Sequence, residues 1–372
     1  MIYKIFPSKD TTIYSQYSEM NTGMDEILDI SLEVNGTPNP SPQSSRVLIQ
    51  FNQSDINNVI SLISSSTWTS DLKLSIANVE GLIDNIILDI YPIAEEWNMG
   101  LGKYQDDPIN TSGASWEFSN YSGSNSWNVG TTDPYITSSY DSVSGGAIWY
   151  TGSSNTSVLP ITSSQLISYY SDKDLNVNIS NIIKAWVSGT IDNNGLIIKQ
   201  RNEFINNINY QPKFKYFSRD TNTIYPPYIE FKWDDSTFNT GSSNQTILDN
   251  PQSVISISEN SGFFYSNSIN KFRINSRPEY PPRVYQTGSI YTTNYYLPSS
   301  SYYAIQDMYT NEFVIDFDEQ FTKISADSVS NYFVLNMNGL EPERYYKIVI
   351  KTIIGDSTII FDNNTYFKII NG

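Results

Sequence analysis

The sequence contains no cysteine and no histidine, and each absence excludes a class of chemistry. Without cysteine the chain has no disulfide bond, no thiolate nucleophile and no cysteine ligand for zinc, so packing must hold the fold together. Without histidine it lacks the commonest general base and metal ligand. Ser-His-Asp and Cys-His catalytic arrangements are therefore excluded.

Positive charge is also scarce. The 22 Lys and Arg residues face 39 Asp and Glu residues, which gives a formal net charge of −17. The basic residues occur singly or alternate along expected strands, and no basic patch opposes the overall charge. Because a surface of this sign repels phosphate backbones, no nucleic-acid partner is expected.

Long apolar runs and an export signal are missing as well. No apolar segment approaches the roughly 20 residues that a membrane-spanning helix needs, so no membrane partner is expected. Residues 1–15, MIYKIFPSKDTTIYS, have neither the basic region nor the apolar region of a secretory signal. The expected place of synthesis is therefore a cytoplasm.

Aromatic and small polar residues are abundant. The 28 Tyr, 17 Phe and 7 Trp residues make up 14% of the chain. Alternating apolar segments such as SRVLIQF, IILDIYPI and YYKIVIK recur between Asn, Ser, Gly and Pro residues, a pattern typical of strands and turns. The sequence predicts an all-β protein, with one helix expected in SDINNVISLISSS and Ser54 as its cap.

The chain is long enough for two domains, each with its own core. The segment 234–253 is polar and contains few large apolar residues, so it is interpreted as a linker. Residues 1–233 are expected to form a large jelly-roll-like β-sandwich. Residues 254–372 are expected to form a smaller immunoglobulin-like β-sandwich.

The first unit contains seven matching regions, in the right order, that resemble a DNRLRE domain, a β-sandwich module related in shape to carbohydrate-binding modules. They are KIFPSKDTTIYSQYSEMNTGMDEILDI, SRVLIQFN, LKLSIANVEG, EEWNMGLG with GASWEF, SGGAIW, VNISNIIKAWVSGTIDNNGLIIKQ and FKYFSRDTNTIYPPYIEFKW. The spacing between them is longer and richer in Asn than in the family. The resemblance implies a stable exterior module with a structural or adhesive role, and not a catalyst.

The tryptophans of this unit allow two interpretations. Residues 98–160 are rich in Gly, Ser, Asn and Thr, and are expected to form ordered loops held by buried rings. Trp97, Trp116 and Trp186 are interpreted as structural anchors of this kind. Trp127 and Trp149 are candidate contacts for a glycan or a partner protein if their rings are exposed, and loop anchors if they are buried.

The second unit carries the segment GLEPERYYKIVIK, residues 339–351. Leu340, Pro342 and Tyr346 resemble the tyrosine corner of a fibronectin-type or immunoglobulin-like sandwich, in which the ring hydroxyl bonds the backbone a few residues upstream. From Tyr346 onward, apolar and mostly charged residues alternate, which predicts one core face and one solvated face. TIIFDNNTYFKII is expected to form a closing hairpin that turns at residues 362–364.

The region upstream, from INSRPEYPPRVYQTGS to SADSVSNYF, resembles segments of virion structural proteins of large contractile-tailed bacteriophages. Its prolines, Pro278, Pro281 and Pro282, have little capacity for ladder hydrogen bonds, so an extended Pro- and Tyr-rich strap is expected. Candidate partner contacts in this unit are Tyr295, Tyr296 and Tyr302.

The sequence shows no catalytic, metal or cofactor site. Glu95 and Glu96 are adjacent and point to opposite faces of a strand, so they do not form a carboxylate pair. Asp316 and Asp318 share a strand face, but calcium requires six to eight oxygen ligands and no EF-hand spacing is present. No phosphate-binding or dinucleotide-binding glycine pattern occurs.

These observations favour a structural component of a tailed-phage virion that acts through protein–protein interfaces. The tail, neck or baseplate is favoured over a capsid decoration, with other virion proteins as partners in a symmetric multi-copy assembly. Such a protein is made in the host cytoplasm and released by lysis, which explains an exterior module without an export signal. The alternative is a glycan-binding or host-adhesion module.

Overall fold

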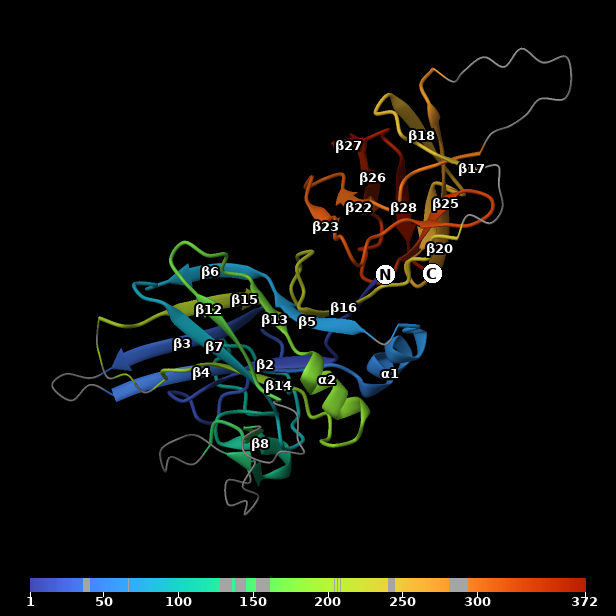
Figure 1. The fold of residues 1–372 in the computed structure, drawn as a ribbon. Helices are drawn as coiled ribbons and strands as arrows, with labels where there is room; N and C mark the ends of the chain where they lie inside the picture. The colour runs from blue at the N-terminus through green and yellow to red at the C-terminus, as the bar shows by residue number, and fades with distance from the viewer. Residues whose placement is uncertain are drawn as a thin grey trace, which may run out of the picture. The chain divides into compact units, whose positions relative to one another are not determined.

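The computed structural model describes residues 1–35, 41–65, 67–127, 136–137, 145–151, 161–203, 205, 207, 209–239, 245–280 and 294–372. Its regular structure is almost entirely β, which confirms the predicted fold class. The chain divides into two compact units, each built of β-sheets (Figure 1). The large unit comprises Ile5–Leu62 and Thr69–Glu230, and the C-terminal unit comprises Met1–Lys4, Ile63–Trp68 and Phe231–Gly372. No helix in the described part of the chain is long and apolar enough to cross a membrane.

The large unit contains a sheet of order β12-β7-β14-β4-β3-β15-β6, in which β2 also pairs with β4. The bounds of these strands are β2 Lys9–Tyr14, β3 Ile27–Asn35, β4 Ser41–Gln50, β6 Ile76–Glu80, β7 Ile86–Pro92, β12 Ser163–Ile167, β14 Leu196–Gln200 and β15 Lys213–Phe217. A second sheet has the order β1-β16-β5-β13, with β1 Ile2–Ile5, β5 Trp68–Leu74, β13 Leu175–Asn178 and β16 Tyr228–Trp233. The division between the units falls within β1, β5 and β16.

Two helices and several short elements complete this unit. Helix α1, Gln53–Leu62, confirms the helix predicted from the sequence; it buries Ile56 and Val59, and Ser54 lies inside its first turn and not before it. Helix α2, Ser180–Val187, follows β13 and buries Trp186. The loop-rich region contains β8 Phe118–Asn120, a 3-10 turn at Tyr121–Gly123, β9 Asn125–Ser126, β10 Ile136–Thr137 and β11 Trp149–Tyr150.

Strand β3 illustrates why this sheet has two different faces. Leu28, Ile30 and Leu32 are at most 1% exposed, because every second residue of a strand points to the same side. The intervening residues, Asp29 and Glu33 among them, lie on the opposite face. Antiparallel pairing with β15 sets Asp29 opposite Lys215. The polar face of these two strands therefore gathers charged side chains of both signs.

The C-terminal unit contains two sheets. One has the order β17-β21-β20-β25-β24, with β18 also paired to β20; its strands are β17 Gln245–Ile247, β18 Ser253–Ser258, β20 Ile269–Pro278, β21 Asn294–Tyr296, β24 Ser325–Ala326 and β25 Asn331–Asn336. The other has the order β19-β28-β26-β22-β23, with β27 also paired to β26; its strands are β19 Phe263–Tyr265, β22 Ser301–Asp307, β23 Phe313–Ile315, β26 Tyr345–Ile354, β27 Ser357–Phe361 and β28 Tyr366–Ile370.

Aromatic rings join the inner faces of these two sheets. Phe333 of β25 stacks on Phe272 of β20 at 5.1 Å and on Tyr303 of β22 at 4.4 Å between ring centroids. Phe272 also packs against Phe367 of β28 at 5.7 Å. Such contacts add to the burial of large apolar areas. The core of the C-terminal unit therefore lies between the two sheets, as in a β-sandwich.

The tyrosine corner has the hydrogen bond that its sequence predicted. The Tyr346 hydroxyl donates to the carbonyl oxygen of Glu341 at 3.2 Å, and the ring is 1% exposed. Leu340 is buried and Pro342 half-buried. Along β26 buried residues alternate with outward-facing ones as predicted, except at Val349, which was expected on the solvated face and is 4% exposed.

The predicted closing hairpin is wrong in its pairing. Strands β27 and β28 both pair with β26, β27 along Ile350–Ile354 and β28 along Tyr345–Lys347. The tight turn therefore lies between β26 and β27 at Gly355 and Asp356, which have φ angles of 53° and 63°. The left-handed backbone conformation favours glycine there. Residues 362–364 instead connect two strands that share β26 as their neighbour.

Part of the predicted linker contributes to the C-terminal unit. Leu248 is buried in its core, and β17 pairs in parallel with β21, while residues 240–244 lie outside the described part of the chain. In the predicted strap, Pro278 ends β20, where it lies opposite Ser253 of β18. Pro281 and Pro282 lie outside the described residues.

Candidate functional site

Four tryptophans of the large unit form one buried cluster. Trp97, Trp116, Trp127 and Trp149 are between 3% and 5% exposed. They pack against apolar residues of strands β2, β4 and β14, namely Ile13, Leu48 and Ile197. The rings thus attach the described loops to the main sheet. Trp127 and Trp149 are therefore buried, and the exposed flat strip on which their role as glycan contacts depended is not formed by them.

A buried ionic cluster lies among these rings. The Arg46 guanidinium lies 4.5 Å from the Trp116 ring centroid and 5.2 Å from that of Trp149. Its Nη2 lies 2.7 Å from Glu203 Oε2, and Lys199 bonds the other oxygen of the same carboxylate. Burial alone raises the pKa of Glu203, but Arg46 and Lys199 together hold that pKa below its ordinary value.

The packing around Arg46 also explains a Gly-Gly pair in the sequence. Gly146 has a φ angle of 79° and accepts a hydrogen bond from Arg46 through its carbonyl oxygen. A Cβ atom at this position would lie 2.4 Å from Arg46 Nη1 and 2.9 Å from the Trp116 ring. Because every charge in the cluster has a partner and the rings enclose it, we interpret it as a structural element.

The three candidate tyrosines lie at different depths. Tyr296 is 0% and Tyr302 is 7% exposed, while Tyr295 is half-buried and packs against the core of the C-terminal unit. Tyr302 has the Lys351 ammonium 5.2 Å from its ring centroid. Tyr296 is therefore a core residue of the free chain and offers no exposed ring to a partner.

Asp316 and Asp318 each accept hydrogen bonds from the backbone of nearby residues. Asp318 caps a turn by accepting N–H bonds from Gln320 and Phe321 at 2.8 and 2.9 Å. Asp316 accepts the N–H of Phe317 at 2.7 Å. Within the described ranges, no group of three or more acidic side chains lies close enough to hold a metal ion.

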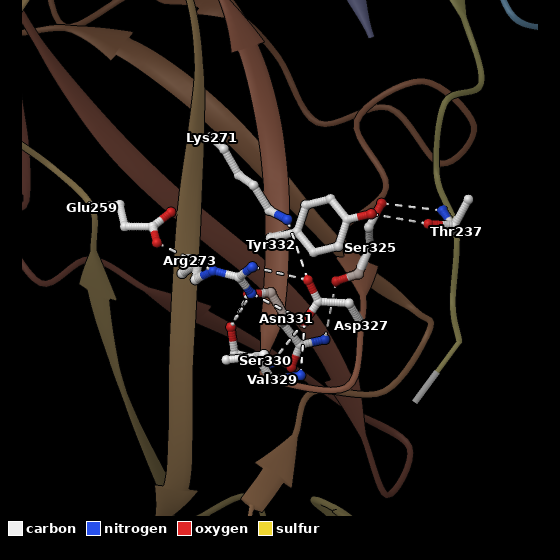
Figure 2. Close-up of polar contacts among 10 residues, drawn as sticks. All are labelled: Thr237, Glu259, Lys271, Arg273, Ser325, Asp327, Val329, Ser330, Asn331 and Tyr332. Carbon is white, nitrogen blue, oxygen red and sulfur yellow. Dashed lines mark hydrogen bonds and ion pairs between the residues drawn. The ribbon is translucent and has the colours of Figure 1, made fainter. Parts of the chain in front are cut away.

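The two outer faces of the C-terminal unit differ in character. On β20 and β25 a polar cluster covers the sheet: Arg273 donates to both carboxylate oxygens of Asp327 at 3.0 Å and lies 3.3 Å from Glu259 (Figure 2). Lys271 lies 3.2 Å from Asp327 and 3.6 Å from the Tyr332 ring centroid. The hydrogen bonds from Arg273 hold the pKa of Asp327 well below its usual range. The charged groups of this cluster are therefore paired with one another.

The opposite sheet exposes aromatic rings instead. We define its aromatic face by four residues on three neighbouring strands: Phe263 and Tyr265 on β19, Tyr366 on β28 and Tyr345 on β26. Their exposed fractions are 58%, 55%, 52% and 37%. Phe263 and Tyr345 both lie opposite Lys368 of β28, one on each side. The register therefore places the rings on adjacent strands of one sheet surface.

Sequence reasoning did not select these four residues. The alternation along YYKIVIK predicted that Tyr346 faces inward, so Tyr345 faces outward by the same rule. The same argument applies to Tyr366 beside the buried Phe367. The contact between β19 and β28 joins segments about 100 residues apart, and no local pattern indicates it.

No family model matches the chain, and no curated protein matches it.

Proposed function

We propose that the chain is a non-catalytic structural component of a larger assembly and that it acts through protein–protein interfaces. The observation that carries this proposal is the aromatic face, Phe263, Tyr265, Tyr345 and Tyr366. Aromatic residues are enriched where proteins associate. Lys368 lies between Phe263 and Tyr345 on the same surface, and its ammonium is paired with Glu343. Burying these rings against a partner removes apolar area from water and supplies the central contacts of an interface.

The sequence resemblance extends this proposal to the particle of a tailed bacteriophage. The partners would be other virion proteins in a symmetric multi-copy arrangement, with the tail, neck or baseplate favoured over the capsid surface. The chain would be made in the host cytoplasm and carried out of the cell in the released particle. A partner that contacts about 800 Å² of this chain would form an interface of standard size.

Two measurements test the proposal. Mass spectrometry of purified particles, separated into heads and tails, is expected to find the chain in one fraction.

Particles assembled with Phe263→Ser plus Tyr366→Ser are expected to carry at least tenfold less of it, because both rings are exposed and their loss weakens binding more than folding. Tyr170→Ser in the large unit is the control, since Tyr170 is 96% exposed and outside the aromatic face. Absence of the chain from every fraction would refute the particle assignment, and full incorporation of the double variant would refute the role of the aromatic face.

A further inference from the structure

The large unit contains a cavity on the polar face of β3 and β15. Its volume is about 320 Å³, at the lower end of the range typical of small-molecule sites. A smaller hollow of about 30 Å³ shares part of its wall. Its wall includes Tyr14, Asp25, Asp29, Glu33, Tyr104 and Lys215.

The sheet register brings opposite charges to this cavity. Asp29 and Glu33 lie on one face of β3, and Lys213 and Lys215 lie on the same face of the neighbouring β15. Lys213 forms an ion pair with Glu33. Asp29 and Lys215 lie directly opposite each other in the pairing of β3 with β15. The arrangement follows from the alternation of side chains along the two strands.

The Asp29 and Lys215 side chains retain bonding capacity. Asp29 Oδ1 is buried and accepts no hydrogen bond from the residues that the structure describes. Among the same residues, no carboxylate lies within 4.0 Å of the Lys215 ammonium. Burial raises the pKa of Asp29 to about 6, against the opposing effect of the two lysines. Asp29 as a whole is half-buried and lines the cavity, so its carboxylate can accept a hydrogen bond from a ligand there.

Aromatic rings form another part of the wall. Tyr104 packs against Tyr14 with ring centroids 5.2 Å apart and against Tyr17 at 6.2 Å. Its side chain is 47% exposed, so part of the ring remains open to solvent. The backbone N–H of Tyr104 donates to Asp25 at 3.2 Å, which ties this loop to the acidic side of the cavity.

The mixture of charges restricts the ligand. An anion would meet the carboxylates of Asp25, Asp29 and Glu33, and a cation would meet the ammonium groups of Lys213 and Lys215. A metal ion lacks a converging set of acidic ligands in the described part of the chain. A hydroxyl group both donates and accepts hydrogen bonds, so one that lies between Asp29 and Lys215 satisfies both.

We propose that this cavity binds a neutral saccharide, with hydroxyl groups bridging Asp29 and Lys215 and a ring face against Tyr104. Neighbouring hydroxyl groups on a sugar ring match a site that offers an acceptor and a donor side by side. The apolar face of the ring matches the open part of an aromatic side chain. The site is independent of the proposed role of the C-terminal unit in assembly, because all of its residues lie in the large unit.

The test combines a glycan array with calorimetry on the full chain. An array of neutral, acidic and amino-sugar glycans selects the ligand, and titration calorimetry then measures its affinity. We expect saturable binding of at least one neutral oligosaccharide. Asp29→Asn, Lys215→Met and Tyr104→Ala should each weaken it at least tenfold. The matched controls are Asp192→Asn and Lys184→Met, which change exposed residues outside the cavity and should leave the affinity unchanged.

Each outcome decides the proposal. Tyr104 is half exposed, so Tyr104→Ala gives a folded variant even if a change at Asp29 reduces stability. Binding of only acidic or only amino-sugar glycans would overturn the proposal, as would failure of every neutral glycan at millimolar concentration. Neutral-glycan binding that all three cavity variants leave unchanged would show that the saccharide site lies elsewhere. Loss of glycan binding with normal incorporation into particles would separate this site from the aromatic face.

Discussion

Both units place an arginine beside a carboxylate, but in opposite surroundings. In the large unit, the side chains of Arg46 and Glu203 are 0% and 1% exposed and tryptophan rings enclose them. In the C-terminal unit, those of Arg273 and Asp327 are 19% and 30% exposed on an outer sheet face (Figure 2). Ion pairs near water contribute little, whereas a buried charge that loses its partner costs several kcal/mol. We therefore expect the buried Arg46–Glu203 pair to contribute more to stability than the outer Arg273–Asp327 pair.

Removing the buried carboxylate should give the largest effect. Glu203→Gln leaves Arg46 and the mostly buried Lys199 without their shared anion, so we expect the free energy of unfolding of the large unit to fall by about 3–5 kcal/mol. Denaturant unfolding followed by tryptophan fluorescence measures this loss of stability. The signal comes mainly from the large unit, because five of the seven tryptophans lie in it, at positions 97, 116, 127, 149 and 186.

The cationic partner provides the comparison for that variant. Arg46→Met leaves Glu203 paired with Lys199, so its cost should be smaller than that of Glu203→Gln, although it also removes two contacts with tryptophan rings. If both variants unfold at the denaturant concentration of the wild type, the buried cluster is not a determinant of stability and the contrast between the units fails.

A second buried carboxylate sharpens the comparison because no lysine or arginine side chain pairs with it in the described residues. Asp10 on β2 is 1% exposed and accepts the backbone N–H of Arg219 at 2.8 Å. Burial raises the pKa of Asp10 to about 7. The folded state therefore binds this proton more tightly than the unfolded state, and stability falls as pH rises from about 4 to about 7.

Asp10→Asn should remove this dependence. We expect the stability of the variant relative to the wild type to increase by on the order of 3–4 kcal/mol between pH 4 and pH 8, because only the wild type pays for ionising a buried carboxylate. Denaturant unfolding of both proteins across this range provides the measurement. A constant difference between them at all pH values would mean that Asp10 titrates normally in the folded chain.

The all-β fold class could be predicted from the sequence because the patterns that indicate strands lie within short segments of the chain. Alternation along β26 and the Leu340–Pro342–Tyr346 pattern are set by neighbouring residues. The structure confirms the pattern, and it confirms the alternation except at Val349, which is buried. The prediction of a closing hairpin was wrong because strand pairing depends on which distant strand is available. Strands β27 and β28 each pair with β26 and not with each other. Local periodicity contains no information on that choice.

The candidate surfaces were less predictable for the same reason. The sequence left the roles of Trp127 and Trp149 open, because an aromatic side chain in a polar segment can be either a buried anchor or an exposed contact. The Arg46–Glu203 pair joins residues 157 positions apart, and the SRVLIQFN segment gave no sign of its partner. The saccharide cavity likewise needs the register of β3 against β15, which places Asp29 opposite Lys215.

The smallest effect is expected at the exposed pair. Arg273→Met removes the bonds to Asp327, but water replaces much of the lost interaction, so the C-terminal unit should lose about 1 kcal/mol or less. The pKa of Asp327 is held low in the folded state, so its contribution is present above about pH 4 and is lost as the pH falls further. The difference between variant and wild type should therefore shrink in acid, which near-ultraviolet circular dichroism of the tyrosines can follow during denaturation. A loss of 3 kcal/mol or more at neutral pH would show that this outer pair behaves like the buried one, because only a desolvated charge left without its partner carries a cost of that size.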